Sequence, residues 1–144
     1  MNYKLISSTI KDIDRLVHYK KKTIFEYAQN LSNEEIDRIN SYVEKHVPLE
    51  LKNYQNIVVD GAVVGCVLLV QKEDDMLLDE IYLEEKFRGA GIGTDIIKNV
   101  VKDNNVVNLW VYKQNERAIS LYKKLGFVVV DETEQRYYMR REKK

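Results

Sequence analysis

The chain is short of the residues that mark disulfide-rich or disordered proteins. Its 144 residues include a single cysteine, Cys66, a single proline and only six glycines, against ten tyrosines. One cysteine excludes an internal disulfide framework and suits a reducing compartment. So little proline with so many aromatic residues argues against a disordered chain. We therefore expect a globular protein with its own hydrophobic core.

Long apolar runs and an excess of one charge sign are also missing. The longest apolar stretch, Ala62 to Val70, has nine residues, whereas a membrane helix needs about 20. Residues 1–10 lack the uninterrupted apolar segment of a signal peptide. Lys plus Arg total 23 and Asp plus Glu total 23, so no overall field attracts nucleic acid or an anionic membrane. We expect a cytoplasmic protein with neither as a partner.

Capping signals and turn residues give the order of elements within what we treat as one domain, residues 1–144. Ser32 with Glu35 resembles a capping box that opens a helix, and Pro48 is expected just past its end. Asp60-Gly61 is a strong two-residue hairpin signal. In chain order we expect a strand at 3–8, a helix capped at 9 and running to 28, a helix capped at 32, strands at 54–59, 62–70 and 76–83, a helix opening at a glycine-rich loop, a strand at 106–112, a helix at 115–125, and strands at 127–130 and 135–140.

This order predicts an α/β fold with a mixed sheet of about six to seven strands flanked by about four helices. Consecutive strands favour antiparallel pairing, and the strand–helix–strand unit in the second half favours one parallel pair.

The glycine-rich loop is the most informative segment. Arg88 precedes Gly89, Gly91 and Gly93 where a helix opens. Alternate glycines let successive backbone N–H groups converge on one anion, and the helix N-terminus adds unpaired donors and a favourable dipole. The loop is therefore suited to a phosphate or pyrophosphate.

Two familiar phosphate loops do not fit. A dinucleotide fingerprint needs a third glycine where this chain has Thr94 or Ile96. A P-loop needs a lysine directly after its last glycine, and the first lysine that follows Gly93 is Lys98.

The remaining pattern resembles the GNAT superfamily of acetyl-coenzyme A-dependent N-acetyltransferases. Two motifs carry the resemblance: Arg88-x-x-Gly91-x-Gly93 and Asn115-x-x-Ala118-x-x-Leu121-Tyr122-x-x-x-Gly126-Phe127. It implies that acetyl passes from acetyl-CoA to a primary amine of a small molecule, protein or peptide, by direct attack in a ternary complex, without a metal. A non-catalytic acyl-CoA-binding sensor or interaction module of the same fold is the alternative, and a homodimer is possible.

The resemblance also assigns the cofactor contacts. It implies pairing of the pantetheine arm with one strand, wrapping of the pyrophosphate by the loop, and further contacts from the helix beyond. The residues so assigned are Ile81, Tyr82 and Leu83; Arg88, Gly89, Ala90, Gly91, Ile92, Gly93 and Thr94; and Asn115, Ala118 and Tyr122. A backbone N–H of Ile81 or Leu83 would stabilise the oxyanion.

The same resemblance makes Tyr122 the general acid for the departing thiolate. A base must also take a proton from the substrate ammonium, and Asp79 and Glu80 are the candidates. Adjacent strand residues point to opposite faces, and the resemblance favours Asp79. A neutral substrate or a water relay would need neither.

The remaining features have simpler interpretations. Cys66, within an apolar run, is expected to be a core residue rather than a nucleophile. Residues 19–22 are expected on the solvent face of the first helix, and 136–141 to form an edge strand guarded by charge. Residues 25–31 are expected to form one wall of the amine site, where Glu26 either attracts a cation or is simply solvated.

Overall fold

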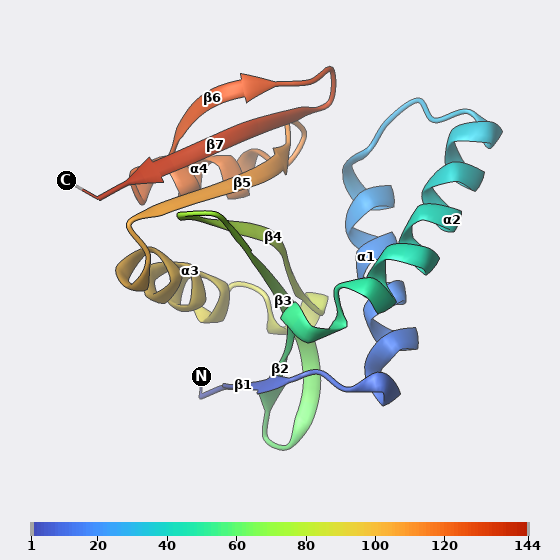
Figure 1. Ribbon diagram of the computed structural model, residues 1–144, viewed down its shortest axis with the longest axis horizontal. Helices are drawn as coiled ribbons and strands as arrows, with labels where there is room; N and C mark the ends of the chain where they lie inside the picture. The colour runs from blue at the N-terminus through green and yellow to red at the C-terminus, as the bar shows by residue number, and fades with distance from the viewer. Residues whose placement is uncertain (1, 144) are drawn as a thin grey trace.

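The computed structural model describes residues 2–143, which form seven strands and four α-helices around one sheet (Figure 1). The predicted order of elements is confirmed. The elements are β1 (Lys4–Ser7), α1 (Ile13–Tyr27), α2 (Asn33–Leu49), β2 (Tyr54–Val59), β3 (Ala62–Lys72), β4 (Asp75–Leu83), α3 (Ile92–Asp103), β5 (Val106–Tyr112), α4 (Glu116–Lys124), β6 (Val128–Glu132) and β7 (Arg136–Glu142).

The sheet is mixed, as predicted, with strand order β1-β2-β3-β4-β5-β7-β6. Only the β4–β5 pair is parallel among the described strands. The prediction of an edge strand at residues 136–141 is wrong, because the β6–β7 hairpin folds back so that β7 pairs with both β5 and β6. The outer strands are β1 and β6.

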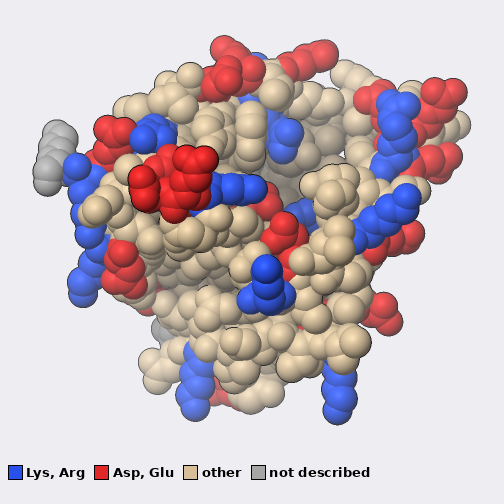
Figure 2. All heavy atoms as spheres, in the orientation of Figure 1, with Lys and Arg blue, Asp and Glu red and all other residues tan. Residues whose placement is uncertain are grey.

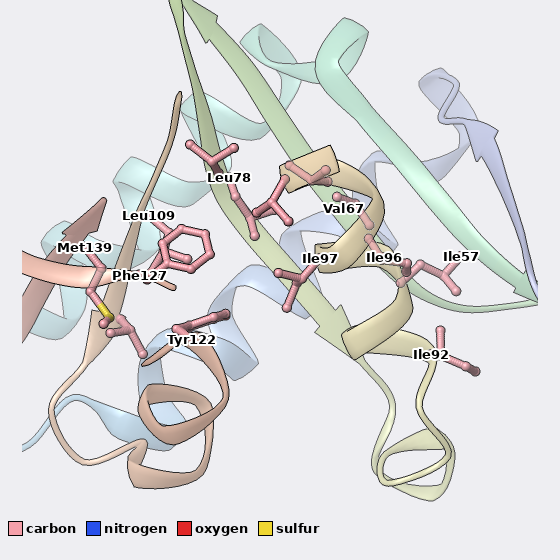
Figure 3. Packing of buried hydrophobic residues seen from close by; sticks show 14 of the residues in the cluster. Ile57, Val67, Leu78, Ile92, Ile96, Ile97, Leu109, Tyr122, Phe127 and Met139 are labelled. Atoms are coloured by element: carbon pink, nitrogen blue, oxygen red, sulfur yellow. The ribbon is translucent and has the colours of Figure 1, made fainter. Parts of the chain in front are cut away.

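Two helices cover each face of the sheet (Figure 1). On one face, α3 and α4 bury a cluster that contains Ile96, Ile97, Tyr122 and Phe127 together with side chains of the central strands (Figure 3). On the other face, α1 and α2 bury a second cluster around Tyr54. The sheet is thus covered on both sides, and the functional groups lie where it opens.

Two details of the first helices differ from the predictions. Tyr19 is buried and the Lys20 side chain is only 15% exposed, so the start of the 19–22 segment does not face solvent. The helix α1 packs against β3 and β4. Pro48 lies inside the last turn of α2 rather than past it. The helix still closes, because the Glu50 N–H bonds to the carbonyl of His46.

The sheet opens between β4 and β5. These strands pair only from Met76 to Leu78 on the β4 side, and β3 and β4 shift register at the same level. Leu69 pairs with Leu78 and Leu68 with Glu80, so Asp79 is the extra residue of a β-bulge in β4. Because a bulge bends its strand, the C-terminal half of β4 diverges from β5 and leaves a gap in the sheet.

Candidate active site

The backbone of β4 beyond the bulge offers unpaired groups to this gap. The Glu84 N–H donates to the carbonyl of Val64 on β3, at 2.8 Å. Because backbone groups alternate in direction along an antiparallel strand, those of Ile81 and Leu83 point away from β3, into the gap. These are the groups that the sequence resemblance assigns to the pantetheine arm.

The glycine-rich loop forms the N-terminus of α3. Gly89 and Gly91 have φ angles of 83° and 88°, a left-handed conformation that favours glycine. Gly91 is the N-cap of α3, and a Cβ added there would meet nothing within 4 Å. The first N–H groups of the helix have no intrahelical partner. They are therefore available to an anion, as predicted for a phosphate loop.

The Arg88 side chain is held beside the loop by three contacts. Its Nε donates to the Leu83 carbonyl at 2.7 Å, its guanidinium lies 5.3 Å from the centre of the Tyr82 ring, and it pairs with Glu26 at 3.3 Å. Glu26 does attract a cation, but the cation is Arg88 and not a group at the amine site. A ligand phosphate would compete with Glu26 for Arg88.

These elements line a groove of about 760 Å³ between β4, α3 and α4. It brings together Ile81, Tyr82, Leu83, Arg88, Gly89, Gly91, Gly93, Thr94, Asn115, Ala118 and Tyr122. The other two residues assigned to the cofactor, Ala90 and Ile92, do not line it. The Ile92 side chain is 2% exposed and belongs to the core cluster, so a side-chain contact from Ile92 is excluded and only its backbone can take part.

Tyr122 and Asn115 stand where the groove meets a smaller cavity of about 190 Å³ beside the β4–β5 gap, since both residues line both spaces. The Asn115 Oδ1 caps α4 by accepting from the Ala118 N–H at 3.3 Å, which leaves its amide N–H groups for other partners. Tyr122 is 7% exposed. Burial, and to a smaller degree Tyr27, raises the pKa of Tyr122 to about 12, so its hydroxyl keeps its proton at neutral pH.

Glu80 lines the small cavity but its oxygens are already engaged. It is 6% exposed, and it accepts hydrogen bonds from the Tyr54 hydroxyl at 2.7 Å and the Cys66 thiol at 3.3 Å. Lys20 pairs with it at 3.4 Å. Burial raises the pKa of the Cys66 thiol well above its usual value, which agrees with its predicted place in the core.

Asp79 also lines this cavity, as do Leu78, Glu80 and Ile81 beside it. Burial lowers the pKa of Lys20, but the carboxylates of Glu80 and then Asp79 outweigh it and the net pKa is raised. Both carboxylates therefore act on one lysine. The bulge is the reason, because it breaks strand alternation at Asp79. Asp79 makes no side-chain hydrogen bond or ion pair within residues 2–143.

A family model of the acetyltransferase (GNAT) domain matches residues 52–129, more than half of the chain. The chain belongs to the GNAT acetyltransferase family. It is 38% identical over 68 residues to thialysine N-epsilon-acetyltransferase of Bos taurus, covering 44% of this chain and 40% of that protein. It is 32% identical over 93 residues to the probable N-acetyltransferase san of Drosophila melanogaster, covering 60% and 50%. The chain thus spans half or less of the length of these curated relatives.

Solved GNAT structures share the fold over nearly the whole chain. The PaiA N-acetyltransferase of Thermoplasma acidophilum, solved with coenzyme A, superposes with a TM-score of 0.80 at 20% identity, covering 99% of this chain and 100% of that one. An N-acetyltransferase of Staphylococcus aureus gives 0.70 at 16% identity, covering 95% and 98%. These likenesses establish the GNAT fold of this chain.

Three residues of this GNAT site were not found from the sequence. Lys20 and Tyr54 hold Glu80, and Arg136 lines the small cavity from β7. No motif marks them, because their roles depend on packing across the sheet. Within residues 2–143 no cluster of three or more His, Cys, Asp or Glu side chains is placed to hold a metal, and none of the helices there has the length and apolar character needed to cross a membrane.

Proposed function

We propose that the chain transfers an acetyl group from acetyl-CoA to a primary amine by direct attack in a ternary complex. One observation carries the proposal. A groove with an anion-binding loop at one end meets, at Tyr122, a cavity that holds a carboxylate without a partner, Asp79. A cofactor in the groove would therefore lie next to the proton donor, Tyr122, and the proton acceptor, Asp79.

In this proposal the cofactor lies along the groove with its pyrophosphate on the N–H groups from Gly89 to Thr94 and on Arg88. The pantetheine arm pairs with the backbone of Ile81 and with the N–H of Leu83, whose carbonyl is already bonded to Arg88. One of these two N–H groups points to the thioester carbonyl and stabilises the oxyanion that forms on attack. The coenzyme A bound in the PaiA structure supports such an occupant for the shared fold.

Two proton transfers are assigned, one to Asp79 in the small cavity and one to Tyr122 at its junction with the groove. Asp79 takes a proton from the substrate ammonium, directly or through water, so that the neutral amine attacks the thioester carbon. The tetrahedral intermediate then collapses and the C–S bond breaks. The thiolate takes the proton of the Tyr122 hydroxyl, and the second proton that the attacking nitrogen loses returns through solvent to Tyr122, so that a neutral amide and free coenzyme A leave. The engagement of Glu80 with Tyr54 and Lys20 supports Asp79 as the base. The single buried cysteine supports a reducing, cytoplasmic location.

Thermal unfolding with and without acetyl-CoA tests the cofactor. At 100 times its dissociation constant a ligand stabilises the native state by about 2.7 kcal/mol, roughly 5–10 °C in Tm for a domain of this size. Arg88→Ala combined with Gly91→Val should abolish the shift, because the side chain is lost and valine is strained at a φ of 88°. Arg15→Ala, on the exposed side of α1, should keep it. No shift in the wild-type protein would refute the proposed cofactor.

Release of free coenzyme A in the presence of amines separates an enzyme from a non-catalytic acyl-CoA-binding module. An enzyme shows amine-dependent thiol release, whereas a binding module shows the thermal shift alone.

A further inference from the structure

A second cavity adjoins the small one on the side away from the cofactor groove. Its volume is about 470 Å³, and it lies between the α1–α2 connection and the β6–β7 turn. Ile24, Tyr42, Tyr112 and Arg136 line both cavities. Figure 2 shows this face hollowed between the β5–β7 side of the sheet and the α1–α2 pair, with acidic and basic side chains around the hollow.

Arg136 stands at the junction of the two cavities as a cation without a counter-ion. Its guanidinium lies 4.6 Å from the centre of the Trp110 ring and 5.9 Å from that of Tyr112. No ion pair involves it among the residues described, whereas Arg140 on the same strand pairs with Asp75 and Glu142. Stacking on an aromatic face fixes the plane of a guanidinium and leaves its N–H edge free for a bidentate carboxylate.

The acids and bases around the outer cavity do not neutralise Arg136. Glu35 is held by the backbone of Ser32, at 3.1 Å, where it caps α2. Glu134 lines the outer cavity from the exposed turn, and no ion pair joins it to Arg136 or to Arg38, which also lines the cavity. In the inner cavity Glu80 is paired with Lys20. One carboxylate, Asp79, and one guanidinium, Arg136, therefore face the same space without partners.

A direct bridge joins the two segments beside the outer cavity. The Gln135 side chain accepts a hydrogen bond from the Gln29 N–H at 2.7 Å and donates to the Gln29 carbonyl at 3.1 Å. This bidentate contact ties the α1–α2 connection to the β6–β7 turn, the two segments that bound the cavity. A long polypeptide that lay between the segments would have to break the bridge, which favours a small acceptor.

We propose that the amine acceptor is a small zwitterion, an amine that carries a carboxylate within a few bonds, with its nitrogen between Asp79 and Tyr122 and its carboxylate on Arg136. The inference rests on the proposed acetyl transfer and names the class of its acceptor. Arg136 acts as a specificity-determining residue, because its half-buried guanidinium, stacked on Trp110 and without a counter-ion, can bind a carboxylate through two N–H groups and an uncharged analogue only weakly.

The test compares matched acceptors on the full chain. The probes are the twenty L-amino acids as free acids, the same compounds as carboxamides, spermidine, and a hexapeptide amide, each assayed by coenzyme A release. Isothermal titration calorimetry of the free acids and carboxamides, with coenzyme A present, measures binding independently of turnover. The variants are Arg136→Gln and, as a matched control outside all cavities, Arg15→Gln.

We expect at least one free acid to exceed its carboxamide tenfold or more in kcat/KM and in affinity. Arg136→Gln should reduce that preference to less than threefold, because the free acid loses more than its carboxamide, whereas Arg15→Gln should leave the preference unaltered. Three results would overturn the inference. The first is a higher kcat/KM for spermidine or the hexapeptide amide than for any free acid. The others are an equal loss of kcat/KM for acids and carboxamides in Arg136→Gln, and no binding of any free acid. Failure of the proposed function is distinct, since it appears as no binding of acetyl-CoA, and calorimetry then still decides whether Arg136 selects carboxylates.

Discussion

Replacing Tyr122 with phenylalanine removes one hydroxyl at the junction of the cofactor groove and the acceptor cavity. The ring would stay packed 5.7 Å from that of Phe127. No hydrogen bond of the hydroxyl exists within residues 2–143, so we expect the free energy of unfolding to change by less than about 1 kcal/mol. General acid catalysis contributes about 10²- to 10⁴-fold, so kcat should fall by that factor, which corresponds to roughly 2.7–5.4 kcal/mol in the barrier.

The assay is steady-state coenzyme A release, with acetyl-CoA affinity measured separately by thermal shift. Affinity should stay nearly unchanged, because the thiolate needs the proton only as it leaves. Since the pKa of Tyr122 is raised to about 12, the hydroxyl does not titrate between pH 6 and 9. The pH profiles of wild type and variant should therefore run parallel over that range. Tyr137→Phe makes the same chemical change on β7, outside the cavities, and should leave kcat unaltered.

Three outcomes would refute this reasoning. Turnover within threefold of wild type would mean that the thiolate takes its proton from water or from another group. A loss shared equally by Tyr137→Phe would point to altered packing of the α3–α4 cluster. A fall in acetyl-CoA affinity as large as the fall in kcat would make Tyr122 a binding residue.

Further predictions concern the bulge and the buried ion pair. Lys20→Met should destabilise the fold by about 3 kcal/mol in urea unfolding, because Glu80 stays buried without its cation; a loss below 1 kcal/mol would contradict this. The pKa of Lys20 is raised in the folded state. The stability that its pairing with Glu80 contributes is therefore fully present below a pH of about 10.4, the value in the unfolded chain, and is lost as the pH rises through the higher folded value. The difference in unfolding free energy between wild type and Lys20→Met should shrink only in strong alkali. Gly65→Ala should cost about 2 kcal/mol, since its Cβ would lie 2.0 Å from the Tyr82 carbonyl oxygen; a variant as stable as wild type would show that β4 moves freely here. Asp79→Asn should lower kcat/KM about 100-fold at neutral pH with unchanged stability, and retained activity would remove Asp79 as the base.

The order of elements and the cofactor loop were accessible from the sequence because both depend on local chemistry. The alternate glycines before α3 need left-handed backbone, and two of them have it. The Asp60-Gly61 turn has positive φ at both residues, as a two-residue hairpin requires. Asn115 caps α4 at the predicted start of that helix. Such signals depend on a few neighbouring residues and can therefore be recognised without knowledge of the fold.

The arrangement of the acceptor site was decided by tertiary structure. A bulge, which depends on the pairing of β4 with β3, makes Asp79 the extra residue of its strand, and Asp79 and Glu80 both line one cavity. Arg136 was expected on an edge strand, and only the return of β7 between β5 and β6 sets it over Trp110.

The sequence by itself determined which backbone segment has the geometry of an anion-binding loop, since that geometry depends on glycines with positive φ and on a helix N-terminus. Which charges remain without partners depends on contacts between residues far apart in the chain. Lys20 neutralises Glu80 from 60 positions away, and this pairing leaves Asp79 free. Local propensity carries no information about such contacts, so the proposed base and the proposed class of acceptor could be inferred only from the tertiary structure.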